Sequence, residues 1–336
     1  MSDKVLKVKN LAVVFKSRER KVHAVRGVDI EVNKGEIVGI VGESGSGKSV
    51  AMKAVIGILA DNASLSADVL TMGDKNLNNL SEREYQKIRG KDITMIFQDP
   101  MTALNPVIRV GKQLEEVIVR NSALSKKEAK EKALEMLERV GIPSPKESSK
   151  RYPHEFSGGM RQRVLISMAL SCNPKLLIAD EPTTALDVTI QAQILDLIKT
   201  MSKDMGTSVI LITHDLGVVA ETCDRVVIMY GGLVMETGSI EEIFYKPKHP
   251  YTMALLQAIP SIDMDEGERL KSIEGFPPSL IDPPKGCPFA ERCEFRMDIC
   301  DSKRPPLKAF SKTHTSMCFL NEEELEYAFR RQKDGK

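Results

Sequence analysis

The sequence predicts an α/β fold over residues 1–240 and a loop-rich, cysteine-containing extension over residues 241–336. Three observations support this: short apolar runs alternate with helical segments, the interval from 99 to 171 is mostly helical in pattern, and prolines recur beyond residue 240. Buried apolar runs of about four to eight residues that are separated by helices are typical of a largely parallel sheet.

The strand pattern recurs along the first 240 residues. The predicted strands are EIVGIVG (36–42), DITMIFQ (92–98), KLLIAD (175–180), SVILITH (208–214) and a strand pair, DRVVIMYGGLVMETG (224–238), that turns at Gly231 and Gly232. A helix from Lys48 to about Leu59 follows the first strand. The segments VGKQLEEVIV, KKEAKEKALEMLERVG and MRQRVLISMALS predict a helical subdomain within about 99–171.

The extension predicts little regular structure. Its clearest helix is YTMALLQA (251–258), and the last residues, NEEELEYAFRRQKDGK, predict a short helix with a frayed tail. Four of the six cysteines, Cys287, Cys293, Cys300 and Cys318, crowd into this proline-rich part. In a reducing cytosol such a cluster more often binds metal than forms disulfides.

Composition narrows the function classes. The 48 basic and 47 acidic side chains nearly cancel, to a net charge of +1, and aromatic residues make up 5%. Nucleic-acid binding is not expected, because it calls for a basic face or for aromatic stacking platforms. No apolar run approaches the ~18 residues of a membrane span, and the first residues, MSDKVLKVKN, lack a signal-peptide core. We therefore expect a cytosolic chain that a partner holds at any membrane on which it acts.

The segment GESGSGKS has the spacing of a phosphate-binding loop: glycine, four residues, glycine, lysine and serine. Successive backbone N–H groups must wrap around phosphate oxygens, and glycine permits the conformations that this requires. Lys48 is expected to reach the β and γ phosphates, and Ser49 to offer its hydroxyl to Mg²⁺. The predicted ATP site comprises Gly42, Glu43, Ser44, Gly45, Ser46, Gly47, Lys48 and Ser49.

Two acidic residues end the strand KLLIAD and follow it. Asp180 stands where a Mg²⁺-binding acid is needed, and Glu181 is placed to orient or deprotonate the attacking water. The alternative is an ordinary acidic strand end. A second glycine-rich helix start, FSGGMRQR, presents Ser157, Gly158 and Gly159. One nucleotide site does not need two such anion sites, so the pattern indicates pairing with a second ATPase chain.

The order of these motifs resembles that of the ABC transporter ATPases over residues 1–240. The resemblance implies the fold of a P-loop NTPase with a helical subdomain and implies ATP hydrolysis. It places Gln98 in the Q-loop, Ser157, Gly158 and Gly159 in a signature that acts on the partner's nucleotide, Asp187 in the D-loop and His214 as the switch histidine. It makes Glu181, His214 and Gln98 catalytic, and it assigns Mg²⁺ to Ser49, Gln98 and Asp180. Asp187 as a plain helix N-cap stays an alternative.

Phe15, 27 residues before the phosphate loop, is in the position of the aromatic residue that stacks on adenine in this family. Its alternative is plain core packing. The phrases FSGGMRQRV, FQDPMTALNP and HPYTMALLQAIP resemble one branch, the D-type ATPase subunits of the oligopeptide and dipeptide importers. The resemblance then covers almost the whole chain and implies a C-terminal extension shared by that branch.

The branch implies partners and a location. Its members pair with an F-type ATPase subunit, act on two membrane permease subunits, and serve an extracytoplasmic binding protein indirectly. The chain is then peripheral at the cytoplasmic face of the cell membrane and energises peptide import. An importer ATPase for another cargo, such as nickel, and a soluble ABC ATPase outside transport are the alternatives.

The spacing of Cys287, Cys293, Cys300 and Cys318 leaves the metal open, since structural zinc sites usually have tighter cysteine pairs and iron–sulfur clusters take four thiolates at varied spacing. Resemblance to the D-type subunits favours a [4Fe-4S] cluster. Zinc, with His314 as a substitute ligand, and free or disulfide-bonded cysteines are the alternatives.

Overall fold

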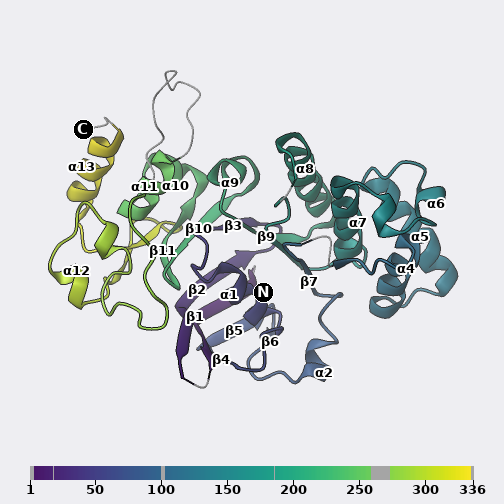
Figure 1. The fold of residues 1–336 in the computed structure, drawn as a ribbon, viewed down its shortest axis with the longest axis horizontal. Helices are drawn as coiled ribbons and strands as arrows, with labels where there is room; N and C mark the ends of the chain where they lie inside the picture. The colour runs from purple at the N-terminus through teal and green to yellow at the C-terminus, as the bar shows by residue number, and fades with distance from the viewer. Residues whose placement is uncertain (1–3, 18, 100–102, 185, 259–272, 334–336) are drawn as a thin grey trace. The chain divides into compact units, whose positions relative to one another are not determined.

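The computed structural model describes residues 4–17, 19–99, 103–184, 186–258 and 273–333 (Figure 1). The chain divides into two compact units, each assembled from separate stretches of sequence. The first comprises Met1–Leu6, Val32–Ile37 and Met72–Ile212, and the second comprises Lys7–Glu31, Val38–Thr71 and Thr213–Lys336. The phosphate loop and the extension therefore belong to one unit, and the signature helix to the other.

Parallel strands form the centre of the first unit. β7 (Ile93–Ile96) pairs in parallel with β8 (Leu176–Asp180), which pairs in parallel with β9 (Ser208–Thr213). Every residue of β8 and β9 is buried. Strands buried on both faces have continuous apolar sequences, and these are the runs from which the parallel sheet is predicted. The predicted α/β class is confirmed.

Helices make up most of the remainder of the first unit, together with the short strand β6 (Lys75–Asn76). They are α2 (Glu82–Tyr85), α4 (Val110–Asn121), α5 (Lys126–Arg139), α6 (Pro145–Ser148), η1 (Pro153–Glu155), α7 (Gly158–Leu170) and α8 (Val188–Met205). Helix α4 packs against α5 and α7, and the three lie together in the teal part of Figure 1. Ser125 and Glu128 form a capping box that starts α5.

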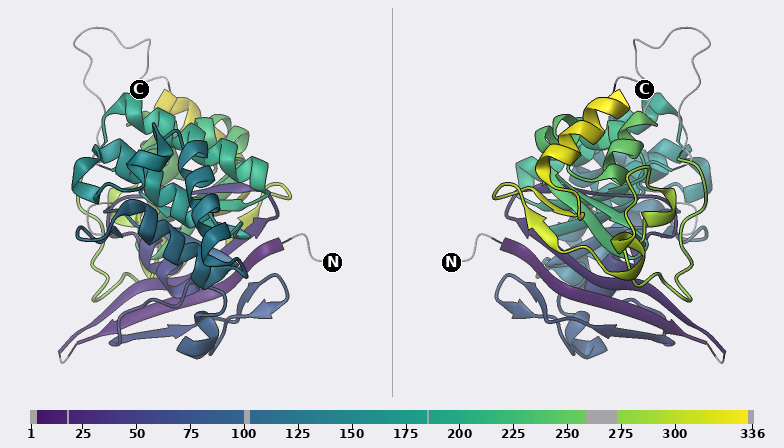
Figure 2. Two further views of the ribbon diagram at one scale, coloured as in Figure 1. Left: turned by 90° about the vertical axis from the view of Figure 1, so that its right-hand side faces the viewer. Right: turned by 90° about the vertical axis from the view of Figure 1, so that its left-hand side faces the viewer.

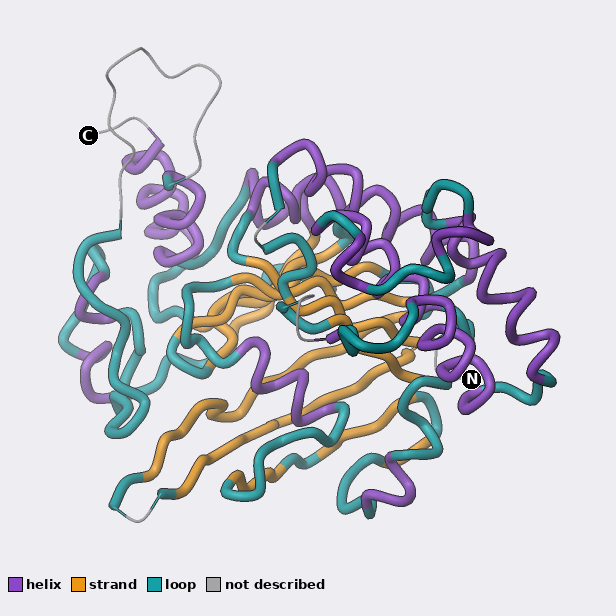
Figure 3. Tube along the Cα trace, turned by 45° about the vertical axis from the view of Figure 1, so that its right-hand side comes forward, coloured by secondary structure: helices purple, strands orange, loops and turns teal. Residues whose placement is uncertain are grey.

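The second unit contains most of two long strands, β1 (Lys4–Lys16) and β2 (Lys21–Asn33), which lie side by side in Figure 3. Strand β1 also neighbours β5 (Val69–Met72) and pairs antiparallel with β4 (Ala63–Ser66). The sequence pattern predicts no strand before residue 36. The physical reason is Asn10, whose φ of 51° places it in the left-handed region, so that burial shifts from Leu6 and Val8 to Leu11 and Val13. This shift breaks the period of two by which strands are found.

The nucleotide-loop strand β3 (Ile37–Val41) pairs in parallel with β10 (Arg225–Tyr230). Strand β10 continues through the predicted Gly231–Gly232 turn into β11 (Leu233–Ser239), which pairs with it antiparallel. The helices α1 (Lys48–Val55) and α9 (Leu216–Thr222) belong to the same unit. Helix α1 ends four residues before the predicted Leu59.

The extension contains more regular structure than its sequence predicts. It comprises α10 (Ile240–Tyr245), α11 (Pro250–Gln257), η2 (Ala290–Arg292), α12 (Ile299–Ser302), β12 (Leu307–Ala309), β13 (Thr315–Met317) and α13 (Glu322–Lys333). Strand β13 pairs antiparallel with both β11 and β12. Helix α13, yellow in the right panel of Figure 2, packs on α11 through Leu325 and Ala328. Across the described ranges of the chain, no helix has both the length and the apolar character that crossing a membrane requires.

Candidate nucleotide-binding site

The phosphate loop connects the end of β3 to the start of α1, as its motif predicts. A Cβ atom added to Gly42 would lie 2.0 Å from the carbonyl oxygen of Met229. One added to Gly47, where φ is 99°, would lie 2.4 Å from the carbonyl oxygen of Ala24. Only glycine fits at either position, so the two ends of the loop depend on the absence of a side chain.

Lys48 lies folded over this loop. Its side chain is buried, at 6% exposure, and Nζ donates hydrogen bonds to the carbonyl oxygens of Gly42 at 2.7 Å and Glu43 at 2.9 Å. Gly47 is the N-cap of α1, and within the described part of the chain no side chain caps that helix end. A buried ammonium beside an uncapped helix N-terminus fits an anion with several oxygens, such as the phosphates of ATP.

Phe15 and His214 are the remaining predicted site residues of the second unit. Phe15 lies near the end of β1, opposite Ala63 of β4, with a partly exposed side chain. His214 directly follows β9 and is exposed. Both side chains are therefore accessible to a ligand, and the roles assigned to them stay predictions.

In the first unit, the structure brings Gln98 and Glu181 together. The Gln98 side-chain amide donates to Oε2 of Glu181 at 2.9 Å, and the Thr184 hydroxyl donates to the same oxygen at 3.0 Å. Asp180, the last residue of β8, is buried at 3% exposure. Thr184 is not among the predicted site residues, and the sequence signals it by its position shortly after the acidic pair.

The backbone of Glu181 has a φ of 47°, which is unusual for a residue other than glycine, asparagine or aspartate. Its N–H donates to the carbonyl oxygen of Ile212 at 3.0 Å, which holds the turn in place. Such a conformation costs about 1–3 kcal/mol and persists where the surrounding structure imposes it, often at active sites. The strained turn directs this carboxylate toward Gln98 instead of letting it continue the strand.

The signature and D-loop residues both begin helices. Ser157 is the N-cap of α7 and accepts a hydrogen bond from the Met160 N–H at 3.3 Å, while Ser157 and Gly158 remain exposed. Asp187 is the N-cap of α8 and accepts from the Ile190 N–H at 3.0 Å. The N-cap alternative for Asp187 is therefore confirmed, and a D-loop role is compatible with it.

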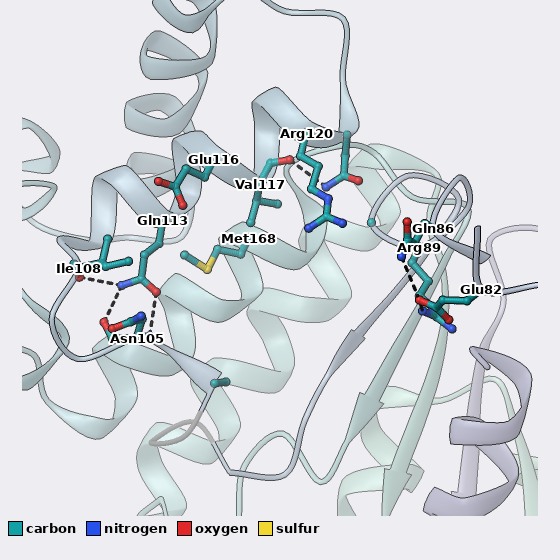
Figure 4. Close-up of a pocket in the computed structure, with 13 residues that line it drawn as sticks. Glu82, Gln86, Arg89, Asn105, Ile108, Gln113, Glu116, Val117, Arg120 and Met168 are labelled. Atoms are coloured by element: carbon teal, nitrogen blue, oxygen red, sulfur yellow. Dashed lines mark hydrogen bonds and ion pairs between the residues drawn. The ribbon is translucent and has the colours of Figure 1, made fainter. Parts of the chain in front are cut away.

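A groove of about 680 Å³ lies in the first unit, between α4 and the segment around α2 (Figure 4). The Gln113 side chain fixes one wall, because Nε2 donates to the carbonyl oxygens of Ile108 at 2.7 Å and Asn105 at 3.0 Å. The lining residues are Glu82, Gln86, Arg89, Gly90, Ala103, Asn105, Ile108, Gln113, Glu116, Val117, Arg120, Asn121 and Met168. The contribution of residues 82–90 was not predicted from the sequence.

A few residues of the quoted motifs lie outside the described residues. These are residues 100–102 after Gln98, Ala185 beside the D-loop, and residues 259–260 at the end of HPYTMALLQAIP.

The cysteines of the extension do gather, but the predicted iron–sulfur cluster is wrong. Cys287, Cys293, Cys300 and Cys318 line one cavity of about 10 Å³, which is about the room that a single water molecule needs. Over the ranges that the structure describes, no group of three or more His, Cys, Asp or Glu side chains is placed to hold a metal ion. Burial raises the pKa of Cys287 and Cys293 to about 12 and that of Cys318 to about 11, which favours protonated thiols.

The zinc alternative fails at the same place. His314, its expected substitute ligand, does not line the cavity, and its Nε2 lies 2.7 Å from Oε1 of the buried Glu236. None of these four cysteines forms a disulfide.

Comparisons with known proteins show the family to which the chain belongs. Residues 25–184 match the family model of the ABC transporter, and residues 235–300 match that of the oligopeptide/dipeptide transporter C-terminal region. The chain is 52% identical to the dipeptide transport ATP-binding protein DppD of Bacillus subtilis over 97% of each chain. It is 50% identical to the oligopeptide transport ATP-binding protein OppD of Salmonella typhimurium, over 96% of this chain and 95% of that one.

Solved structures give the same result. The dimeric bacterial ABC transporter cassette MJ0796 has a TM-score of 0.61 and 29% identity to this chain, and the match covers 70% of this chain and 98% of that one. By its motifs, its fold and its near full-length similarity to these relatives, the chain belongs to the ABC transporter family, among the ATP-binding proteins that carry the oligopeptide/dipeptide transporter C-terminal region.

Proposed function

We propose that this chain is the ATP-hydrolysing subunit that energises the import of dipeptides or oligopeptides across the cytoplasmic membrane, from a peripheral position at its cytoplasmic face. The observation that carries the proposal is the buried Lys48 in a phosphate loop, in a chain with a peptide-transporter C-terminal region. The relatives' names favour peptides over nickel and over a function outside transport. In this proposal residues 1–240 bind nucleotide and residues 241–336 form the extension.

In the proposed mechanism, different groups of the protein bind the phosphates, the adenine and Mg²⁺ and position the attacking water. Amides of Gly42–Ser49 and the Lys48 ammonium hold the phosphates, and Phe15 stacks on adenine. Ser49, Gln98 and Asp180 are the residues that would hold Mg²⁺, and the ion would supply positive charge to neutralise the phosphates. Glu181 positions the attacking water, and its contact with Gln98 gives the carboxylate a fixed direction.

His214 is proposed to contact the γ-phosphate. Ser157, Gly158 and Gly159 are proposed to complete the site of a second ATPase chain, since they are presented at an exposed helix start. The cassette MJ0796, solved as a dimer, supports pairing of ATPase chains. An F-type subunit as that partner remains the expectation from the branch resemblance.

The groove of Figure 4 is proposed to receive a cytoplasmic helix of a permease subunit. Its walls come from α4, from residues 82–90 and from residues 103–108. A helix seated there therefore contacts residues that lie five to ten positions after Gln98, whose side chain donates to Glu181. An amphipathic helix in a groove is a common mode of recognition between proteins. This arrangement offers a route by which nucleotide state reaches the membrane subunits.

Two variants on one helix test this docking. Val117 lines the groove, whereas Val119, two residues along α4, is exposed outside it. Val117→Arg should abolish co-purification with the permease subunits, and Val119→Arg should not. Equal co-purification of both variants, with unchanged thermal unfolding midpoints, would remove the groove from the proposal.

The cargo is tested by reconstitution. The complete transporter in proteoliposomes should hydrolyse ATP faster when the binding protein carries a peptide. Faster ATP hydrolysis with nickel alone, or ATP hydrolysis that no substrate accelerates, would exclude peptide import.

A further inference from the structure

The extension contacts the phosphate loop through Glu43, the second residue of that loop. Nη1 of Arg292 lies 2.9 Å from both carboxylate oxygens of Glu43. The Arg292 side chain is 6% exposed and that of Glu43 is 25% exposed, so water screens this ion pair less than one at the surface. The two residues are 249 positions apart in the sequence and belong to the same compact unit.

The Arg292 guanidinium is itself held in one orientation. Nε donates to the carbonyl oxygen of Glu274 and Nη2 to that of Ile273, both at 2.9 Å. Nη1 also donates to the Tyr230 hydroxyl at 2.9 Å. The guanidinium carbon lies 5.7 Å from the ring centre of Tyr230 and 6.0 Å from that of Phe289, within the range of cation–π attraction. A cation held at each nitrogen has little freedom to follow a moving carboxylate.

A second contact fixes the backbone of the same loop residue. The Glu43 N–H donates to the hydroxyl of Tyr251 at 3.1 Å. Tyr251 is fully buried in α11, and its ring centre lies 4.5 Å from that of Tyr230 and 5.1 Å from that of Phe289. Glu43 is thus held at its side chain by η2 and at its backbone by α11, both of which are elements of the extension.

From these contacts we infer that Arg292 and Tyr251 are positioning residues for nucleotide binding, which hold the phosphate loop in the conformation that accepts ATP. The inference rests on the proposed function, in that Gly42–Ser49 must be the ATP site. A loop that is ordered before binding avoids the entropy cost of ordering on the ligand. The extension then contributes to ATP affinity without contacting the nucleotide.

The expected kinetic signature follows from this role. Freeing one loop residue costs about 1–2 kcal/mol of ordering entropy on binding, which corresponds to a five- to thirty-fold weaker affinity. The Kd for MgATP and the KM should therefore rise by about that factor in Arg292→Met and Tyr251→Phe. The kcat should change little, because Glu181 and Gln98 make none of these contacts.

The test is a double-mutant cycle in the full-length chain, with the Kd of the slowly hydrolysed analogue MgATPγS as the readout. Glu43→Gln, Arg292→Met and their combination should weaken binding by the same factor, since each removes the same ion pair. The charge swap of Glu43→Arg with Arg292→Glu should recover part of the affinity. Arg296→Met is the matched control, because Arg296 lies four residues along the same loop and pairs with the exposed Asp301 at 2.7 Å.

The outcomes separate this inference from the proposed function. A wild-type Kd in Lys48→Ala would show that Gly42–Ser49 is not the site, and both would fail. A large loss in Lys48→Ala, with wild-type Kd values in folded Arg292→Met and Tyr251→Phe, would overturn the positioning role alone. Additive losses in the cycle, or an equal loss in Arg296→Met, would also overturn it. If Arg292→Met does not fold, the positioning role is decided by Tyr251→Phe and Glu43→Gln, which remove fewer contacts.

Discussion

The phosphate loop, residues 42–49, and the cysteine loop, residues 287–300, belong to the same unit but are built from different kinds of groups. The phosphate loop relies on backbone: glycines fit where a Cβ would collide, and no side chain among the described residues caps the start of α1, beside the buried Lys48. The cysteine loop relies on side chains: its thiols and that of Cys318 surround a space of about 10 Å³, and burial raises the pKa of Cys287 and Cys293. No other residue can replace a glycine where a Cβ atom would collide with the backbone. Cysteines that lie close together, by contrast, can pack as buried core residues as readily as they can bind a metal.

The largest expected effect tests the role of the phosphate loop. Lys48→Ala removes a charged donor that reaches phosphate oxygens, and the affinity for MgATP should fall about 100-fold. Isothermal titration calorimetry measures it. Lys53→Ala, on the same helix, is the control and should bind normally. Comparable affinity in both variants would mean that the loop does not hold the phosphates.

The second prediction tests the cysteine loop. A pKa of about 12 for Cys287 and Cys293, against an ordinary value of 9.0, lowers the thiolate fraction at pH 8 about a thousandfold. A thiolate of higher pKa is more nucleophilic, which recovers part of the lost reaction rate. Alkylation by iodoacetamide should therefore be about 50-fold slower than for an exposed cysteine of ordinary pKa. Mass spectrometry of labelled peptides measures the rate. Labelling at the rate of a free cysteine would show that these thiols are not buried.

The third and smallest effect concerns His249, which starts the helix that carries Tyr251. Its Nδ1 accepts a hydrogen bond from the Tyr251 N–H at 2.9 Å, and burial lowers its pKa from 6.5 to about 3. Because the pKa of His249 is lower in the folded than in the unfolded state, its contribution to folding stability is fully present above pH 6.5. This contribution is lost as the pH falls towards 3, because the unfolded chain takes up the proton more readily than the folded chain.

Between pH 7 and pH 5 the wild type should therefore lose about 2 kcal/mol more stability than His249→Asn, whose side chain still serves as a helix N-cap. Urea unfolding at the two pH values measures the difference. Parallel pH dependence in the two proteins would show that this histidine titrates normally.

The sequence predicts a structural feature well where only one residue type can meet the physical requirement of that feature. The loop from Gly42 to Ser49, the strand before it and the helix after it follow from the need for backbone amides around phosphate. The strand β1 escaped prediction because Asn10 reverses its alternation. Arg292 carries no sequence signal, since its partner Glu43 is 249 positions away. The cysteine spacing indicated proximity correctly but did not determine whether the thiols bind a metal.

The most direct test of the account compares binding and turnover in Glu181→Gln. The substitution keeps the shape of the side chain that contacts Gln98 and Thr184 but removes the negative charge that acts on water. We expect the MgATP affinity to stay within about threefold of wild type, because the phosphate loop is unchanged, while single-turnover hydrolysis falls at least about 100-fold. Hydrolysis at the wild-type rate, or loss of ATP binding in the folded variant, would contradict the proposed division between a loop that binds and a carboxylate that activates water.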